Sequence, residues 1–167
     1  MSARLVAVIV MGVTGSGKTT VGRLLAQRMD CSFFDADDFH PPENVEKMRS
    51  GQPLEDADRL PWLEKLRELI DDELRAGRSL VLGCSALRQK YRDALISSPG
   101  QVVFLYLKIR PETARARLEA RAGHYMPASL VASQFETLEE PEHAIVVDGE
   151  LPPTEAVIVA VQHLQGK

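Results

Sequence analysis

The segment from Gly12 to Thr19, Gly-Val-Thr-Gly-Ser-Gly-Lys-Thr, most constrains how this chain folds. It matches the phosphate-binding loop pattern G-x-x-x-x-G-K-[ST], in which glycines let successive backbone N–H groups converge on an anion. Before it, residues 5–11 form a continuous apolar run rich in β-branched residues, as expected of a strand buried on both faces. After it, apolar residues recur at helical spacing through Met29. A strand, a glycine loop and a helix in this order predict a nucleoside triphosphate site.

The same motif predicts which groups hold the nucleotide. The Lys18 ammonium adds positive charge at the β- and γ-phosphates, and the Thr19 hydroxyl is placed to ligate Mg²⁺. Farther along the chain, Arg117 is expected near the base and Arg121 near the phosphates, although a helix face with i,i+4 Glu–Arg support is the alternative. The expected ligands of ATP are Gly12, Val13, Thr14, Gly15, Ser16, Gly17, Lys18, Thr19, Thr20, Arg117 and Arg121.

Length and composition limit the class of protein. A chain of 167 residues, 44% of them hydrophobic, suits a single domain over residues 1–167. The net charge of −4 argues against a general affinity for nucleic acid or anionic membranes. The two cysteines, Cys31 and Cys84, lack zinc-ligand spacing and are expected to be reduced thiols. Without a signal-peptide or transmembrane pattern, a cytoplasmic protein is expected.

Apolar runs and helical patterns alternate along the rest of the chain. Four further strands are predicted, over residues 32–34, 79–82, 102–107 and 144–147. Helices are predicted over residues 60–76, 87–96, 112–121 and 153–164. Near-continuous apolar strands separated by helices are typical of a parallel sheet covered on both faces. We therefore expect a three-layer α/β fold with a five-stranded parallel sheet and the nucleotide at the carboxyl ends of its strands.

Two segments fit this alternation poorly. Residues 36–61 are dense in Pro, Gly and charged residues, and residues 122–141 begin with a Gly-His-Tyr-Met-Pro stretch that leads into a helical pattern. Long excursions within a compact domain are usually binding segments or lids. In a small kinase, we expect residues 36–61 to bind the substrate and residues 122–141 to form a mobile lid.

Acidic residues follow the second predicted strand, beside the expected phosphate site. Asp35 and Asp37 are two residues apart on an extended segment, so both project to one side. Asp35 is expected in the magnesium shell through water, and Asp37 on the acceptor hydroxyl as a base or an orienting group. Carboxylates that cap a helix or face solvent are the alternative. Lys18 and Asp37 are thus the expected catalytic residues.

Polar and basic side chains in the segment that follows are candidates for binding the acceptor. His40, Arg49 and Arg59 are candidate donors to a polar anionic substrate, since Arg binds carboxylates in a fork geometry. A surface network in which Asp56 or Asp58 pairs with Arg59 is the alternative.

A second basic cluster follows the third predicted strand. Arg88 and Arg92 are four residues apart on a predicted helix and are expected to share a face toward a carboxylate or phosphoryl group. A solvated basic face is the alternative. The expected substrate ligands are Asp37, His40, Arg49, Arg59, Arg88 and Arg92, and the expected metal ligands are Thr19 and Asp35.

Longer segments carry a family resemblance. They are residues 35–63, which begin Asp-Ala-Asp-Asp-Phe-His-Pro, and residues 84–93, 121–125 and 133–139. In these segments the chain resembles the small gluconokinases, within the P-loop kinases that also include shikimate kinases. The resemblance covers nearly the whole chain and is far more specific than the phosphate loop.

The resemblance implies a substrate and a reaction. It implies ATP- and Mg²⁺-dependent phosphorylation of D-gluconate on its terminal hydroxyl, giving 6-phosphogluconate, by a cytoplasmic homodimer in sugar-acid catabolism. Gluconate offers one carboxylate for arginines and several hydroxyls for His, Asp and Asn side chains. Shikimate is the nearest rival acceptor, because charge alone does not separate two polyhydroxy acids. A nucleotide-dependent switch that hydrolyses ATP slowly and acts through a partner is the remaining alternative.

Overall fold

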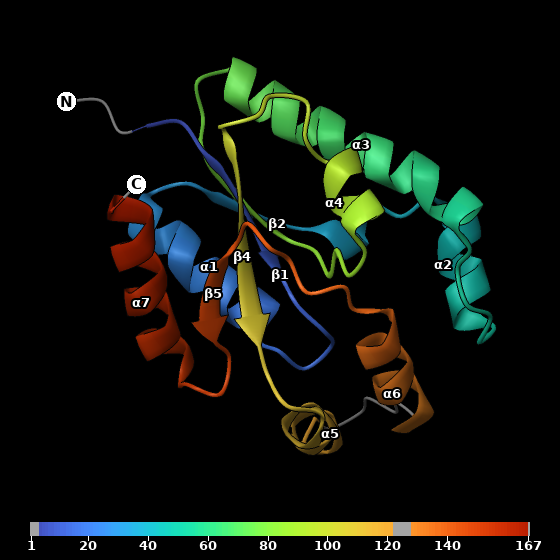
Figure 1. The fold of residues 1–167 in the computed structure, drawn as a ribbon. Coiled ribbons are helices and arrows are strands. Elements are labelled where there is room, and N and C mark those ends of the chain that lie inside the picture. The colour runs from blue at the N-terminus through green and yellow to red at the C-terminus, as the bar shows by residue number, and fades with distance from the viewer. Residues whose placement is uncertain (1–3, 122–127, 167) are drawn as a thin grey trace.

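The computed structural model describes residues 4–121 and 128–166 and confirms the predicted parallel sheet (Figure 1). In that part of the chain the strands are β1 (Ala7–Met11), β2 (Ser32–Asp35), β3 (Leu80–Gly83), β4 (Val102–Lys108) and β5 (Ile145–Asp148). They pair in the order β2-β3-β1-β4-β5, and every pairing is parallel. The central strand β1 is buried along its whole length, as a strand covered on both faces must be.

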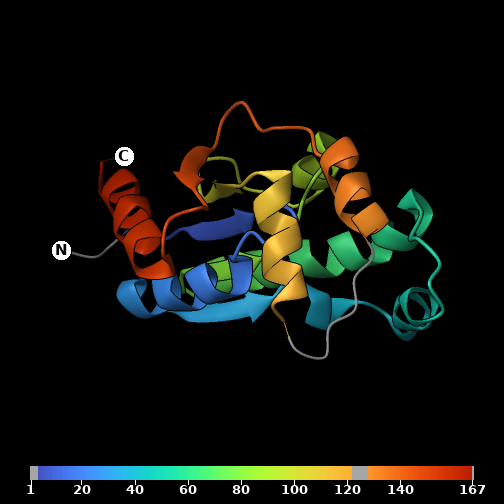
Figure 2. The same ribbon diagram turned by 90° about the horizontal axis from the view of Figure 1, so that it is seen from below.

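Helices cover both faces of the sheet and complete the predicted three layers (Figures 1 and 2). On one face α1 (Lys18–Met29) packs beside α7 (Pro153–Gln165), and on the other lie α3 (Asp56–Arg75) and α4 (Gln89–Ala94). The sheet has a hydrophobic core on each face, and alternate residues of β1 belong to one or the other. Val8 lies in the core under α1 and α7, and Ile9 lies in the core under α3.

The remaining elements lie around the carboxyl ends of the strands, where the functional site is expected (Figure 1). The short 3₁₀-helix η1 (Ala36–Phe39) and α2 (Pro42–Arg49) follow β2, and α5 (Pro111–Glu119) follows β4. Helix α6 (Ala128–Thr137) packs against α5. The predicted substrate segment therefore consists of η1, α2 and the first turns of α3.

One helix boundary in this segment differs from the prediction. The sequence pattern places the start of a helix at Leu60, whereas α3 begins at Asp56. The Asp58 carboxylate accepts a hydrogen bond from the backbone N–H of Glu55 at 2.8 Å, which caps the helix one turn earlier. Pro61 then lies inside the second turn of the helix, where it removes one backbone donor.

The expected lid is described only in part. Residues 122–127 lie outside the described residues, and the remainder of the segment contains α6 and the start of the connection to β5. Its closure over a substrate stays a prediction. Across the described ranges, no helix combines the length and the apolar character needed to span a membrane.

Candidate active site

The phosphate loop joins β1 to α1 in a conformation that requires glycine. Gly12 and Gly17 have φ angles of 150° and 97°. A Cβ atom on Gly12 would lie 2.9 Å from the Leu107 carbonyl oxygen, so a larger residue would force the loop away from β4. Helix α1, which is described in full, has no side-chain cap and no acidic residue in its first turn. Its positive N-terminal end is therefore free to bind an anion.

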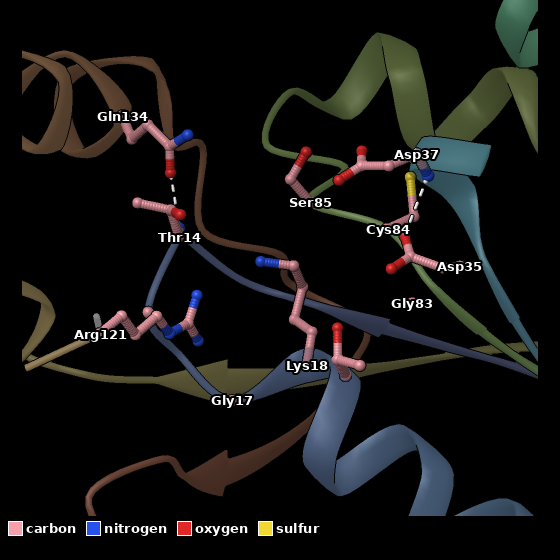
Figure 3. A pocket seen from close by; sticks show the side chains of 12 residues that line it. Thr14, Gly17, Lys18, Asp35, Asp37, Gly83, Cys84, Ser85, Arg121 and Gln134 are labelled. Carbon is pink, nitrogen blue, oxygen red and sulfur yellow. Dashed lines mark hydrogen bonds between the residues drawn. The ribbon is translucent and has the colours of Figure 1, made fainter. Parts of the chain in front are cut away.

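A pocket of about 200 Å³ lies beside this loop at the carboxyl ends of the central strands (Figure 3). Eight of the predicted site residues line it: Thr14, Gly15, Gly17, Lys18, Thr19, Asp35, Asp37 and Arg121. The fold thus brings three parts of the chain to one cavity. They are the phosphate loop, the acids after β2, and Arg121, the last described residue before residues 122–127.

Lys18 is one of two cationic side chains that line the pocket, with Arg121. Its Nζ donates hydrogen bonds to the carbonyl oxygens of Gly12 and Val13, both at 3.0 Å. Burial lowers the pKa of Lys18 to about 8, although Asp37 and Asp35 act in the opposite direction. A triphosphate placed beside this ammonium would restore its preference for the charged form.

Nucleoside triphosphate binding is therefore expected to take up a proton at alkaline pH. At pH 9 Lys18 is mostly neutral in the free protein, and the bound polyanion raises its pKa, so most of one proton enters with the ligand. Near pH 7 the uptake should be small. Titration calorimetry in two buffers of different ionisation enthalpy measures it. Equal uptake at pH 7 and pH 9 would contradict the assignment, as would the same uptake by Lys18→Arg, whose guanidinium does not titrate.

Asp35 and Asp37 extend from the end of β2 toward this pocket (Figure 3). Asp35 Oδ1 accepts a hydrogen bond from the backbone N–H of Asp37 at 2.9 Å, so the capping alternative holds for Asp35 in part. Desolvation, and then the neighbouring Asp35 carboxylate, raise the pKa of Asp37. Cys84 also lines the pocket, but burial raises the pKa of its thiol to about 12 and keeps it protonated.

The structure decides between the two interpretations of the acids around Arg59. The Asp58 carboxylate is 2.7 Å from Lys47 Nζ, and Asp56 accepts a hydrogen bond from the Tyr91 hydroxyl at 2.7 Å. The alternative, in which Asp56 or Asp58 pairs with Arg59, is therefore not what the structure has. The Arg59 guanidinium lies over the Tyr91 ring, 5.3 Å from its centroid, and no carboxylate of the described residues is within ion-pair distance of it. Arg59 is left available to an anionic ligand.

Arg88 and Arg92 do not share a helix face, which corrects the prediction. Arg88 precedes α4 as its N-cap residue, with an extended backbone, so helical spacing does not apply to it. Arg92 is only 2% exposed and does not line the pocket. It donates hydrogen bonds to the carbonyl oxygens of Ala86 at 2.7 Å and Glu139 at 2.8 Å. Arg92 thereby holds Ala86, which has a φ of 45°, and ties the loop after β3 to the segment after α6.

Replacement of Arg92 by Ala is expected to lower the free energy of unfolding by about 2–5 kcal/mol, because buried carbonyl groups lose their donor. Urea unfolding followed by circular dichroism measures the change. Arg49→Ala is the matched control, since the Arg49 side chain is 75% exposed and its nearest acidic oxygen, on Glu46, is 4.0 Å away. That control should shift stability by less than about 0.5 kcal/mol. A loss below about 1 kcal/mol for Arg92→Ala would contradict the role assigned to it.

Of the remaining predicted arginines, Arg121 lines the Lys18 pocket and Arg117 does not. Arg117 donates to the carbonyl oxygens of Gly15 at 3.0 Å and Gly149 at 2.7 Å, and so joins the loop to the connection after β5. Together with Arg121 and Thr20 it lines a second cavity of about 330 Å³. This cavity adjoins the phosphate loop, and Asp37 does not line it. It offers room for the nucleobase of a nucleotide whose phosphates lie on the loop.

Ser85 and Gln134 are among the pocket residues that received no role from the sequence. Ser85 lines the pocket after β3, and Gln134 reaches it from α6 (Figure 3). Gln134 Oε1 accepts a hydrogen bond from the backbone N–H of Thr14 at 2.6 Å, so α6 contacts the phosphate loop directly. Both residues belong to the segments that carry the family resemblance, which was the signal available for finding them.

A parallel sheet of this strand order, with a phosphate loop after β1 and acids after β2 at one pocket, defines a P-loop kinase. A family model described as shikimate kinase matches residues 14–144. The gluconokinase of Gluconobacter oxydans is 43% identical over 162 residues, which cover 95% of this chain and 91% of that protein. The thermosensitive gluconokinase of Escherichia coli is 46% identical over 134 residues, covering 80% and 72%. The chain belongs to the gluconokinase family.

Solved structures agree with this assignment. The crystal structure of a gluconokinase from Sinorhizobium meliloti has a TM-score of 0.87 and 40% identity, covering 97% of this chain and 94% of that one. A shikimate kinase from Aquifex aeolicus, at 20% identity and a TM-score of 0.59, shares the fold. The predicted family and fold are confirmed, and they make this protein a nucleotide-dependent kinase.

Proposed function

We propose that this protein is an ATP:D-gluconate 6-phosphotransferase, which transfers the γ-phosphoryl group of ATP to the terminal hydroxyl of D-gluconate and forms 6-phosphogluconate. The observation that carries the proposal is the meeting of Lys18 and Asp37 at one pocket, in a chain whose relatives are named gluconokinases. A cationic phosphate site next to a carboxylate suits transfer to a hydroxyl, because catalysis depends on positioning and charge stabilisation.

The phosphates of ATP would lie on the loop, with Mg²⁺ beside them. Thr19 and Asp35 both line the pocket and offer oxygen ligands, the type that Mg²⁺ prefers. The described residues hold no cluster of three or more His, Cys, Asp or Glu side chains suited to a metal. That fits Mg²⁺, which in kinases is held by one or two carboxylates, water and substrate phosphates. When bound, the Mg²⁺ ion would neutralise negative charge on the phosphoryl group that is transferred. The cavity of about 330 Å³ beside Arg117 is assigned to the nucleoside of ATP.

The acceptor would lie between Asp37 and the start of α3. Asp37 orients the terminal hydroxyl and accepts its proton, for which a raised pKa is suitable. Arg59 is assigned to the gluconate carboxylate and His40 to its hydroxyls, with Arg88 as a second candidate for the carboxylate. Arg49 and Arg92 are no longer assigned to the substrate, because one is exposed and the other is bound to backbone carbonyls.

Replacement of Arg59 by Ala is expected to raise the KM for gluconate about 10- to 100-fold, because a charge-assisted hydrogen bond contributes about 1.5–3 kcal/mol. The KM for ATP should change little. Initial-rate kinetics with each substrate varied in turn measure both values, and Arg49→Ala serves as the matched arginine control. An unchanged gluconate KM in Arg59→Ala would remove Arg59 from the site.

The proposal also includes closure of residues 122–141 over the substrates, which would exclude water and suppress hydrolysis of ATP. The contact of Gln134 with Thr14 supports it, since this links α6 to the loop that binds the phosphates. A cytoplasmic location and a homodimer, both implied by the family resemblance, complete the proposal. Sedimentation velocity tests the dimer.

ADP release with Mg·ATP tests the reaction, with D-gluconate, shikimate, glycerate, glucose and no acceptor compared in parallel. The proposal predicts a strong response to gluconate alone. A selective response to shikimate would keep the kinase and discard the assignment of residues 36–61. ATP binding without a response to any acceptor would instead favour a nucleotide-dependent switch.

A further inference from the structure

The ring of His40 is held in a defined plane. It stacks on the indole of Trp62 with 4.2 Å between ring centroids and an angle of 13° between the ring planes. Trp62 is itself fixed, because it is buried and its Nε1 donates a hydrogen bond to the Ala36 carbonyl oxygen at 2.7 Å. The stack fixes the ring plane of His40 but not which ring nitrogen carries the proton.

Asn44 determines the position of that proton. This residue of α2 is 3% exposed, and its Nδ2 lies 2.9 Å from the Asp58 carbonyl oxygen and 3.2 Å from His40 Nδ1. Since a carbonyl oxygen only accepts, the amide nitrogen and not the amide oxygen of Asn44 must face Asp58. Its second hydrogen then points at His40 Nδ1, which must accept it. A neutral His40 therefore carries its proton on Nε2.

The surroundings also keep the ring neutral. Burial, and then the Arg59 guanidinium of α3, lower the pKa of His40. Protonation would additionally place an N–H at Nδ1 against the N–H of Asn44. The acidic groups nearby do not reverse this effect, since Asp58 of α3 is paired with Lys47. Asp37 of η1 is directed to the Lys18 pocket.

We propose that Asn44 is a positioning residue that holds His40 in the Nε2–H form, so that His40 gives the sugar-acid substrate one fixed hydrogen-bond donor. His40 follows directly after η1, which carries Asp37, and its Nε2 has no partner among the described residues. The inference rests on the proposed gluconate site. The inference goes beyond that site by assigning to the sugar-acid substrate a hydrogen-bond donor, Nε2 of His40. It also makes Asn44, which acts through His40 and not on the substrate itself, a determinant of specificity.

Long-range ¹H–¹⁵N NMR of enzyme labelled in its histidines tests the first half, with the His40 signals assigned from a His40→Gln sample. The proposal predicts a neutral ring at pH 7 with the proton on Nε2. In Asn44→Asp the new carboxylate only accepts hydrogen bonds, so the proton should move to Nδ1. A proton on Nδ1 in the wild-type protein, an imidazolium at pH 7, or no change of tautomer in a folded Asn44→Asp protein would overturn the proposal.

Kinetics test the second half. The side-chain nitrogen of Gln at position 40 falls near the place of Nε2, and that of Asn near the place of Nδ1. The gluconate KM should therefore be about tenfold higher in His40→Asn than in His40→Gln, with equal KM values for ATP. Asn44→Asp should also raise the gluconate KM about tenfold and leave the ATP KM unchanged. Equal gluconate KM values in the two His40 variants would overturn the proposal.

The two proposals fail in different ways. A wild-type enzyme that ignores gluconate refutes the proposed function, and the NMR spectra still decide whether Asn44 sets the tautomer of His40. A wild-type enzyme that responds to gluconate, together with His40 variants of equal KM, refutes only the inference.

Discussion

Replacement of Lys18 by Ala is expected to lower kcat for ADP release by about 10³-fold or more and to leave the folded state intact. The loss follows from the place of Lys18 in the phosphate loop, where its charge meets the phosphates on which charge develops during transfer. Initial rates at saturating Mg·ATP and gluconate measure the effect. Lys65→Ala is the matched control, since Lys65 is exposed on α3, and should keep wild-type activity.

The same replacement should not destabilise the protein. Burial lowers the pKa of Lys18, so at pH 7 its charged form is less favourable in the folded chain than in the unfolded chain. Removing this charge is therefore expected to offset the loss of two hydrogen bonds to loop carbonyls, so that the variant stays folded. An unfolded Lys18→Ala protein would show that Lys18 holds the loop together, and an active one would exclude it from catalysis.

Replacement of Asp37 by Asn is expected to lower kcat by about 10²- to 10⁴-fold with little change in the KM for ATP. Asn keeps an oxygen that can accept a hydrogen bond from the acceptor hydroxyl, but it cannot take the proton. Asp38→Asn is the matched control, because Asp38 is the adjacent carboxylate and does not line the pocket. A kcat within threefold of wild type in Asp37→Asn would leave Asp37 no more than a minor orienting role.

The pH dependence of kcat separates the two roles of Asp37 further. The carboxylate must be ionised to accept a proton, and its pKa is raised by desolvation and by Asp35. The rate should therefore fall as pH decreases through a value above the ordinary Asp pKa, and Asp37→Asn should lack this acid limb. The same acid limb in both proteins would show that another group titrates.

Much of this fold could be predicted because its strongest signals are local. The apolar run that becomes β1 and the glycine loop after it lie next to each other in the sequence, and both occur in the structure as expected. The predicted start of α3, at Leu60, is wrong, because two signals within a few residues of each other, Pro61 and the capping by Asp58, compete to set the first turn of the helix. Which of them sets it depends on hydrogen bonds.

The partners of the arginines could not be predicted, because they come from distant segments. Arg59 is available only because Lys47 and Tyr91 occupy the neighbouring acids. Arg92 is buried because Glu139, far along the chain, offers it a carbonyl oxygen. Such contacts depend on how α2, α3 and α4 pack, which no spacing of residues in the sequence specifies.

The position of phosphate on the product tests the central claim most directly. Enzyme, Mg·ATP and D-gluconate are incubated together, and the product is examined by ¹H–³¹P correlation NMR. The account predicts one phosphomonoester whose phosphorus couples to the protons on C6 of gluconate, because Asp37 and Lys18 are expected to bring the terminal hydroxyl to the γ-phosphate. Phosphate on another carbon would contradict the assigned orientation of the acceptor, and inorganic phosphate alone would contradict transfer to gluconate.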